Sequence, residues 1–393
     1  LGHVLLSYII DPFLDPTRRA ATNHTNYWEA VEMAQAYLDL GFAVDVIGFP
    51  NQTYVPDKPY DLVIDSRHNL QRLASRLPSG CVKVFHGDTS HITFHNAAEA
   101  RRLLDLQTRR GVTLQPRRFE RPNLAIEHAD CVTLLGNEAT ERTYRYANKP
   151  IYRLPVPSTV RWPWPDHKDW SACRRRFVFL ASGGLVHKGL DLVLEAFAAM
   201  REYELYICAP VDPRPVDRSA AAPSRMYGLS VDTNRFAHPD AMYREQDFRV
   251  AYAKELYDTP NIHTLGWVDL ASSDFQSLIQ SCAGIIHPSC AEGASTSLVT
   301  GMHAALAPIA TYESGVDIDL FGHLLKVATV DEIQHAVVEM VNLPLPRFKA
   351  MARAAWESAN STHTRDHYAE TYRRVAEDIV QRIGAKGPIT CLS

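Results

Sequence analysis

The sequence ASGGLVHKGLDLVLEAF occupies residues 181–197 and joins a buried strand to a helix. The apolar run FVFLAS at 177–182 is typical of a buried parallel strand, and the segment 191–200 is typical of a helix. A glycine pair at 183–184 and a lysine lie in the turn between them. The free amides and the dipole of a helix N-terminus attract anions at such turns. This stretch therefore predicts a phosphate-friendly turn in an α/β sheet.

A second turn of the same kind follows at residues 287–302, with the sequence HPSCAEGASTSLVTGM. The apolar run CAGIIHP at 282–288 predicts a strand, and the small residues at 293–297 predict the start of a helix. Glu292 lies between the two. Because parallel strands end at one edge of a sheet, we expect both turns in the crevice at the carboxyl edge, where open α/β sheets bind ligands.

The rest of the chain repeats this alternation of short apolar runs and helical patterns. Such runs lie at 3–10, 44–49, 60–65, 81–86, 131–135, 204–209, 261–266 and 306–311. The segment 151–170 is rich in proline and tryptophan, which neither a helix nor a central strand tolerates well, and it marks a domain boundary. We predict an α/β protein with doubly wound domains at 1–160 and 161–363, followed by a helix and tail at 364–393. The stretch 210–259 is interpreted as an insertion or lid.

Composition excludes several classes of protein. The chain has 393 residues, of which 46% are apolar and 22% charged, as in globular proteins of two or three domains. Its net charge of -4 argues against a duplex-DNA binder, and no nucleic-acid partner is expected. The seven cysteines form no CxxC pair, which argues against a disulfide framework or zinc ribbon and favours the cytoplasm. The first segment lacks the features of a signal peptide, so we expect a strand there.

The nucleotide-binding motifs of dehydrogenases and P-loop proteins are missing, since no GxGxxG follows the first strand and no GxxxxGK[ST] occurs. Gly183 and Gly184 would instead let the backbone approach a diphosphate, and Lys188 would place a positive charge on its oxygens. The alternative for Lys188 is an exposed lysine at a helix start. Glu292 could accept hydrogen bonds from sugar hydroxyls, or it could only cap the helix that follows.

These residues resemble the retaining GT-B glycosyltransferases of family 4 (group 1). Between Arg176 and Asp317 the motifs KGLDLVLEAF, PNIHTLGWV, CAGIIHPSCAEG, SL..GM and ESGVD occur in the order found in the donor-binding domain of that family. The resemblance implies two Rossmann-like domains that face a cleft, with the C-terminal helix crossing back to the first. It also implies a metal-independent hexosyltransferase of glycan biosynthesis, in which a nucleotide-diphosphate sugar is the donor substrate and no cofactor is needed.

The resemblance also implies roles for single residues. Lys188 would bind the donor diphosphate, Glu292 the donor sugar, and His86 would face the transferred sugar. The nucleotide would lie near Leu298, and the donor phosphates would contact the backbone amides of Gly293, Ala294, Ser295, Thr296 and Ser297. Leaving-group stabilisation and positioning would then carry the reaction, while the acceptor attacks from the same face.

Three features depart from the family pattern. Gly184 stands where family members usually carry an arginine, and Thr300 stands where they carry a glutamate that binds the ribose. The usual glycine-rich loop after the first strand is replaced by residues 11–26, whose Arg18 and Arg19 are candidates to supply the missing positive charge. A catalytically weakened nucleotide- or glycan-binding relative, or a sugar-nucleotide epimerase, is therefore kept as an alternative.

Residues 101–121 contain seven arginines and only two acidic residues, Asp105 and Glu120. A solvated helix face is one interpretation. The other is an anion-binding surface for a lipid-linked, acidic or other glycan acceptor, or for the inner face of a membrane, with Arg109, Arg110, Arg117 and Arg118 as the contacts. His91 and His95 have metal-ligand spacing on a helix but lack a third ligand, so we expect no metal.

Overall fold

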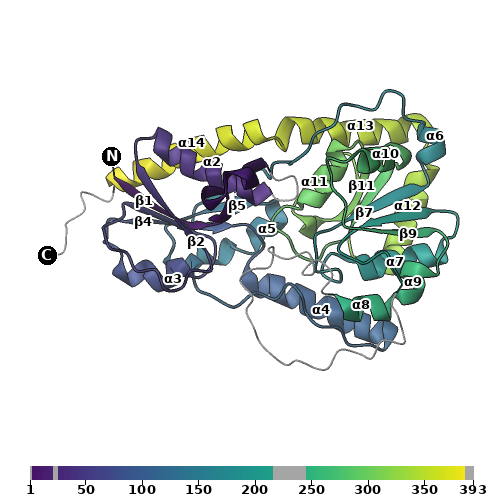
Figure 1. Cartoon of the computed structure of the whole chain (residues 1–393), viewed down its shortest axis with the longest axis horizontal. Helices are drawn as coiled ribbons and strands as arrows, with labels where there is room; N and C mark the ends of the chain where they lie inside the picture. The colour runs from purple at the N-terminus through teal and green to yellow at the C-terminus, as the bar shows by residue number, and fades with distance from the viewer. Residues whose placement is uncertain (1, 21–24, 216–244, 386–393) are drawn as a thin grey trace.

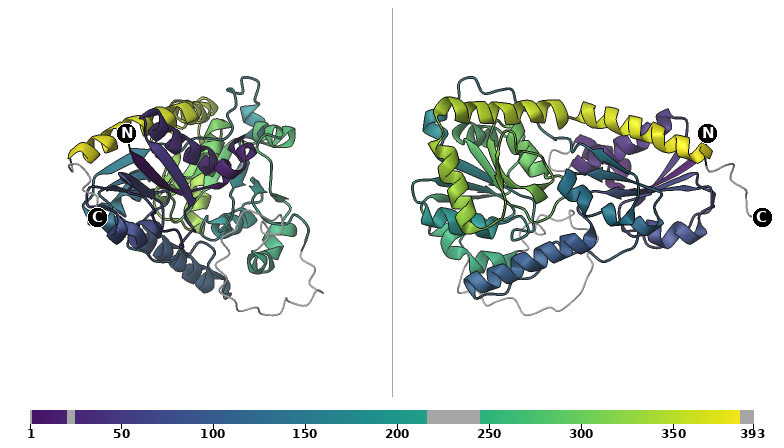
Figure 2. Two further views of the ribbon diagram at one scale, coloured as in Figure 1. Left: turned by 60° about the vertical axis from the view of Figure 1, so that its left-hand side comes forward. Right: turned by 180° about the vertical axis from the view of Figure 1, so that it is seen from behind.

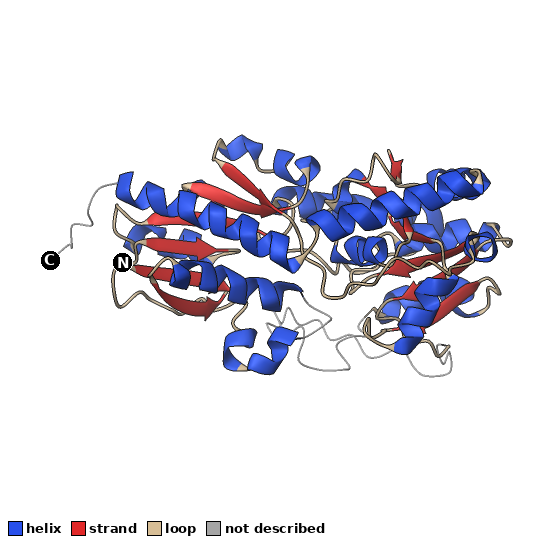
Figure 3. Ribbon diagram, turned by 90° about the horizontal axis from the view of Figure 1, so that it is seen from above, coloured by secondary structure: helices blue, strands red, loops and turns tan. Residues whose placement is uncertain are grey.

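The computed structural model describes residues 2–20, 25–215 and 245–385, of which 19, 20, 384 and 385 are described by backbone alone. Two α/β halves lie side by side (Figure 1). The strands form two separate groups, drawn in red in Figure 3. The predicted insertion falls largely on residues 216–244, which lie outside the described part of the chain.

The first sheet is parallel throughout, with the strand order β2-β1-β3-β4-β5-β6. Its strands are β1 His3–Tyr8, β2 Ala43–Gly48, β3 Leu62–Asp65, β4 Val82–Gly87, β5 Cys131–Leu135 and β6 Ile151–Leu154. The sequence analysis missed β6, which opens the proline-rich segment. It forms at an edge of the sheet, and its four residues lie between Pro150 and Pro155 with no proline among them.

The second sheet is also parallel, with the order β12-β11-β10-β7-β8-β9. Its strands are β7 Arg176–Leu180, β8 Glu204–Cys208, β9 Ile262–Gly266, β10 Gly284–His287, β11 Ala307–Thr311 and β12 His323–Leu325. From β7 the chain continues to β8 and β9 on one side of the sheet. It then returns to β10 on the other side of β7 and continues outward to β11 and β12. The neighbours β7 and β10 therefore flank the topological switch point of this sheet.

Helices cover the two sheets. The α-helices are α1 Asp11–Leu14, α2 Thr25–Asp39, α3 Asn69–Leu73, α4 Ile92–Arg110, α5 Glu138–Arg142, α6 Trp170–Cys173, α7 Leu190–Ala199, α8 Gln246–Ala251, α9 Ala253–Tyr257, α10 Ser273–Ser281, α11 Thr296–His303, α12 Val330–Asn342, α13 Leu345–Thr362 and α14 Arg365–Ala385. Short 3-10 helices lie at Pro16–Ala20, Ala74–Arg76, Ile126–His128, Arg145–Ala147 and Tyr312–Ser314. None of the helices within the described residues has the length and apolar character needed to cross a membrane.

The C-terminal helix crosses back to the first half of the molecule, as predicted. Helix α13 packs against α11 and β11 of the second half, whereas α14 packs against α2, β4 and β6 of the first (Figure 2, right). Aromatic contacts hold α14 in place, with ring centroids 5.6 Å apart for Trp28 and Tyr368 and 6.3 Å apart for Tyr37 and Tyr372. The buried tyrosines of α14 thus belong to the core of the first half.

Helix α4 follows β4 of the first sheet but ends on the second half, where it lies beside α8 (Figure 1). Leu106 is fully buried in the core around α7. Arg109 Nη2 contacts Asp191 Oδ2 at 2.6 Å, and Arg110 Nη1 contacts Glu255 Oε1 at 2.7 Å. Helix α4 is therefore a strut that joins the two halves through apolar and ionic contacts.

Arg110→Ala is expected to destabilise the protein by about 1.5–3 kcal/mol, because it removes charge-assisted hydrogen bonds to Glu255. It also removes the contact of the guanidinium with the ring of Tyr252, 4.3 Å from its centroid. Thermal unfolding followed by circular dichroism measures the loss. Arg101→Ala, an exposed arginine on the same helix, is the matched control. Equal midpoints for the two variants would contradict the role of α4 as a strut.

Candidate functional site

The two turns that the sequence analysis singled out meet at the carboxyl edge of the second sheet. One follows β7 and holds Gly183, Gly184 and Lys188, and the other follows β10 and holds Glu292. Because β7 and β10 are hydrogen-bonded parallel neighbours, both turns leave the same edge at the switch point. The Nζ atom of Lys188 donates a hydrogen bond to Oε1 of Glu292.

Lys188 and Glu292 form a buried ion pair, with side chains 7% and 9% exposed. Glu292 Oε1 also accepts a hydrogen bond from Ser289 Oγ at 2.6 Å. Burial alone would raise the pKa of Glu292, but the surrounding groups, of which Lys188 contributes most and Arg118 also contributes, together outweigh it and hold that pKa well below its ordinary value. Burial lowers the pKa of Lys188, and the Glu292 carboxylate opposes this shift. The charge of each residue therefore favours the ionised form of the other.

Backbone amides of the glycine turn already have an anionic partner. Gly183 and Gly184 have φ angles of 145° and 71°, which glycine adopts readily. The amides of Gly184 and Leu185 donate to the carboxylate of Glu245, at 2.7 Å and 3.1 Å. Glu245 was missed by the sequence analysis, because it lies 61 residues from Gly184 along the chain and no local motif marks it.

The loop after Glu292 leads into α11 through a well-formed N-cap. Ser295 Oγ accepts from the amide of Leu298 at 3.2 Å and shares a hydrogen bond with His287 Nε2 at 2.8 Å. The amide of Ser295 donates to Ser314 O at 2.9 Å. This corrects the prediction that the Ser295 amide binds a donor phosphate, because the amide already has an acceptor within the protein. Thr296 and Ser297 occupy the first turn of the helix, whose amides have no acceptor inside the helix.

Two residues of α11 that the sequence analysis assigned to the donor are buried within the protein. Leu298 is fully buried in the core of the second half. Thr300 is 3% exposed, and its hydroxyl donates to Thr296 O at 2.8 Å. The ribose contact inferred for position 300 and the nucleotide contact of Leu298 stay predictions. The Thr300 hydroxyl is already hydrogen-bonded to the backbone of its own helix.

The first half closes over the Glu292 loop. Thr140 Oγ1 donates to Gly293 O at 2.9 Å, and Asn137 Nδ2 donates to Tyr312 O at 3.0 Å. A Cβ atom on Gly293 would lie 2.4 Å from Asp88 O, so only glycine lets the backbone of the first half approach this closely. The site therefore lies where the two halves touch, and both contribute to it.

His86 lies at the end of β4 and is fully buried. Its Nδ1 shares a hydrogen bond with Thr133 Oγ1 at 2.9 Å, and its ring packs edge-on against Tyr8 with centroids 5.0 Å apart. Burial lowers its pKa to about 4, which makes the imidazole neutral at pH 7. The contact of His86 with a transferred sugar stays a prediction.

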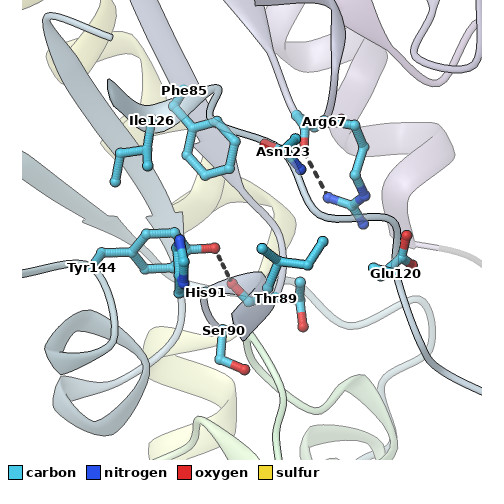
Figure 4. Close-up of a pocket in the computed structure, with 11 residues that line it drawn as sticks. Arg67, Phe85, Thr89, Ser90, His91, Glu120, Asn123, Ile126 and Tyr144 are labelled. Carbon is cyan, nitrogen blue, oxygen red and sulfur yellow. Dashed lines mark hydrogen bonds between the residues drawn. The ribbon is translucent and has the colours of Figure 1, made fainter. Parts of the chain in front are cut away.

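A small cavity of about 20 Å³ lies in the first half next to Arg67, Phe85 and Tyr144 (Figure 4). It has room for about one water molecule and not for a sugar. The Tyr144 hydroxyl donates to Thr89 O at 2.8 Å across it, and Arg67 donates to Ser66 O at 2.8 Å. Arg67 also forms an ion pair with Asp88, which stiffens the backbone that touches Gly293.

A wider open groove of about 750 Å³ adjoins the cavity on the first half. Its lining includes the exposed aromatic side chains of Phe94 and Tyr146. His91 also lines it and accepts from the amide of Thr93 at 3.3 Å as the N-cap of α4. His95 Nε2 bonds to Arg118 O at 2.8 Å, so the two histidines are engaged separately within the fold.

Three of the seven arginines in the arginine-rich stretch are paired with carboxylates of the second half. Arg109 pairs with Asp191 and Glu195, Arg110 with Glu255, and Arg117 with Asp247. The expectation of an unbalanced positive field is therefore wrong for these three residues, because the acids that balance them come from far along the chain. Excess positive charge therefore no longer supports the predicted contacts of these three arginines with an acceptor or a membrane.

Arg18, in the loop after the first strand, makes its described ion pairs within that loop and not with the Lys188 turn. Arg18 Nη1 contacts Asp11 Oδ1 at 2.9 Å, and its Nε lies 3.5 Å from Asp15 Oδ2. Arg18 is therefore paired within its own loop. The side chain of Arg19 lies outside the described part of the structure.

Comparison with known proteins identifies the fold. No family model matches the sequence, and no curated protein matches it. The solved structure of HepE from Anabaena in complex with UDP and glucose is 13% identical, with a TM-score of 0.55 over 97% of this chain and 100% of that chain. Sucrose-phosphate synthase from Thermosynechococcus elongatus is 13% identical, with a TM-score of 0.62 over 96% and 99%.

A third solved structure is WaaG, a glycosyltransferase involved in lipopolysaccharide biosynthesis, which is 13% identical with a TM-score of 0.52 over 96% of this chain and 99% of that chain. All three likenesses extend over nearly the whole of both chains. Together with the switch-point geometry of the second sheet, they establish that this chain has the GT-B fold.

Proposed function

We propose that the protein is a glycosyltransferase that moves a sugar from a nucleoside-diphosphate sugar to an acceptor. The observation that carries this proposal is the buried Lys188–Glu292 pair at the switch point of a GT-B fold. A lysine suits the oxygens of a diphosphate, and a carboxylate suits the hydroxyls of a sugar. Both lie where an open α/β sheet binds its ligand.

The ion pair gives each group a partner while no ligand is bound. A buried charge without a partner is costly, and each member of the pair removes that cost from the other. On donor binding, the diphosphate would take over Lys188 and the sugar hydroxyls would take over Glu292. The exchange replaces one set of charge-assisted hydrogen bonds by another.

The reaction would break the bond between the anomeric carbon and the β-phosphate oxygen and form a bond from that carbon to the acceptor oxygen. The negative charge that develops on the diphosphate would meet Lys188 and the first-turn amides of α11. The proton of the acceptor hydroxyl would pass to the leaving phosphate oxygen. We propose that the acceptor attacks the anomeric carbon from the face that the diphosphate leaves, so that the anomeric configuration is retained. We also propose that the reaction needs no metal ion.

The acceptor would be a glycan, free or lipid-linked. A hexose is the sugar we propose for transfer. The open groove with Phe94 and Tyr146 offers the aromatic surface on which sugar rings commonly pack, and it lies on the half of the molecule that does not carry Lys188.

A thermal-shift screen with nucleoside diphosphates and their sugars, in the presence of EDTA, tests the proposal. A ligand at 100 times its dissociation constant adds about 2.7 kcal/mol to the stability of the folded state. Stabilisation, followed by release of nucleoside diphosphate only when a glycan acceptor is added, is the expected result. Binding without turnover would favour a binding module, and an epimerised sugar formed without acceptor would favour an epimerase. No stabilisation by any of these nucleotides would overturn the proposal.

A further inference from the structure

Arg118 reaches from the first half of the molecule to the glycine turn of the second. It belongs to the loop between α4 and β5. A Cβ atom on Gly184 would lie 2.4 Å from Cγ of Arg118 and 2.8 Å from its Cδ. The stem of Arg118 therefore occupies the space that any larger residue at position 184 would need.

Buried groups hold the backbone of Arg118 in this position. Oε1 of Glu99 accepts hydrogen bonds from the amides of Arg117 and Arg118, at 2.8 Å and 3.0 Å. The ring of His95 bonds to the carbonyl oxygen of Arg118 at 2.8 Å. Glu99 and His95 are each 1% exposed, so the anchor is part of the core rather than a surface contact.

The guanidinium of Arg118 differs from those of its neighbours. Arg117, the preceding residue, contacts Asp247 Oδ1 at 2.6 Å. The Arg118 side chain makes no hydrogen bond or ion pair with any residue in the ranges that the structure describes. Its charge nevertheless reaches the site, since it helps to lower the pKa of Glu292 and also lowers that of Lys188.

The guanidinium of Arg118 therefore forms no ion pair with a described residue. Lys188 pairs with Glu292, and the Glu245 carboxylate accepts from the backbone amides of the turn. Arg118 adds a positive charge that no described carboxylate meets in an ion pair. An arginine held over a glycine turn presents a planar set of donors suited to phosphate oxygens. A diphosphate carries more than one negative charge, so Lys188 alone would leave it incompletely balanced.

We infer that Arg118 binds the diphosphate of the donor across the boundary between the two halves, with Gly184 making room for its stem. This inference rests on the proposed function and names a residue of its phosphate site that the first half supplies. The phosphate site is then complete only while the two halves are in contact. Arg118 thus serves the donor rather than the acceptor to which the sequence analysis assigned it.

Titration calorimetry with the nucleoside diphosphate that binds the parent most tightly, and with the matching nucleoside, tests this inference. Arg118→Gln is expected to weaken diphosphate binding at least tenfold and to leave nucleoside binding within twofold. Arg118→Lys should restore part of the loss, because it returns the charge without the planar donors. Arg117→Gln is the matched control and should stay within twofold of the parent for both ligands.

A second variant tests the contact with Gly184. Gly184→Ala should weaken diphosphate binding in the parent by displacing the Arg118 stem, and it should weaken binding much less when residue 118 is already Gln. Equal losses in both backgrounds would overturn the role of the contact. Parent-like diphosphate binding by Arg118→Gln would overturn the inference while leaving the proposed function intact. Failure of the parent itself to bind any nucleoside diphosphate would overturn both.

Discussion

Lys188→Ala is expected to abolish sugar transfer and to weaken nucleoside-diphosphate binding at least tenfold. The change removes the cation that the diphosphate would meet. It also leaves the Glu292 carboxylate buried without its partner, and breaking a buried pair in this way costs about 3–5 kcal/mol of stability. Steady-state transfer rates, titration calorimetry and the midpoint of thermal unfolding measure the three effects.

A double variant separates the loss of stability from the loss of function. In Lys188→Ala with Glu292→Gln no buried charge is left unpaired, so stability should recover in part while transfer stays absent. Lys254→Ala, an exposed lysine of α9, controls for a general effect of losing a positive charge. A single Lys188→Ala variant with parent affinity and rate would show that the lysine is not part of a phosphate site.

Glu292→Gln is expected to lower transfer by about two orders of magnitude while nucleoside-diphosphate affinity changes only a few-fold. The amide can keep the hydrogen bond from Ser289 but cannot accept as strongly from sugar hydroxyls, and one lost charge-assisted bond is worth about 1.5–3 kcal/mol. Transfer rates with saturating donor, together with calorimetry of the nucleoside diphosphate, make the comparison. Glu370→Gln on α14 is an exposed control. A folded Glu292→Gln variant with the parent rate would remove Glu292 from the site.

The same variant has a pH signature. The pKa of Glu292 is depressed, so its contribution to stability is present above the ordinary carboxyl pKa and is lost as pH falls below it. Glu292→Gln should therefore lose less stability than the parent on acidification. Burial lowers the pKa of Lys188 with no carboxylate to oppose it in this variant, so diphosphate binding should weaken at a lower pH than in the parent as pH rises.

Local sequence patterns predicted most of the fold because buried parallel strands are short continuous apolar runs. The run at 131–135 is β5, and the helical pattern from Thr364 to Ile383 is most of α14. The pattern failed at β6, an edge strand of four residues that is only partly buried and is followed by prolines. An edge strand needs fewer apolar residues, so its signal in the sequence is weaker.

The sequence predicted that the Lys188 turn and the Glu292 turn lie at the same edge of the sheet, but it did not predict the ion pair between them. Each residue lies in a turn directly after a buried strand, and the carboxyl ends of neighbouring parallel strands lie at one edge. That two such turns meet depends only on β7 and β10 being neighbours, which the doubly wound pattern makes common. The sequence alone was sufficient to bring the two turns together, and the structure added the contact between their side chains.

Only the tertiary structure decided which charges meet across the two halves. Arg110 and Glu255 are 145 residues apart, and Arg117 and Asp247 are 130 apart. The sequence determines two α/β domains and two anion-friendly turns, because strand burial and turn chemistry depend on neighbouring residues. It does not determine that Arg118 lies over Gly184 while Arg117 pairs with Asp247. Charge attraction is not directional, so any arginine could pair with many carboxylates until packing brings one of them within reach.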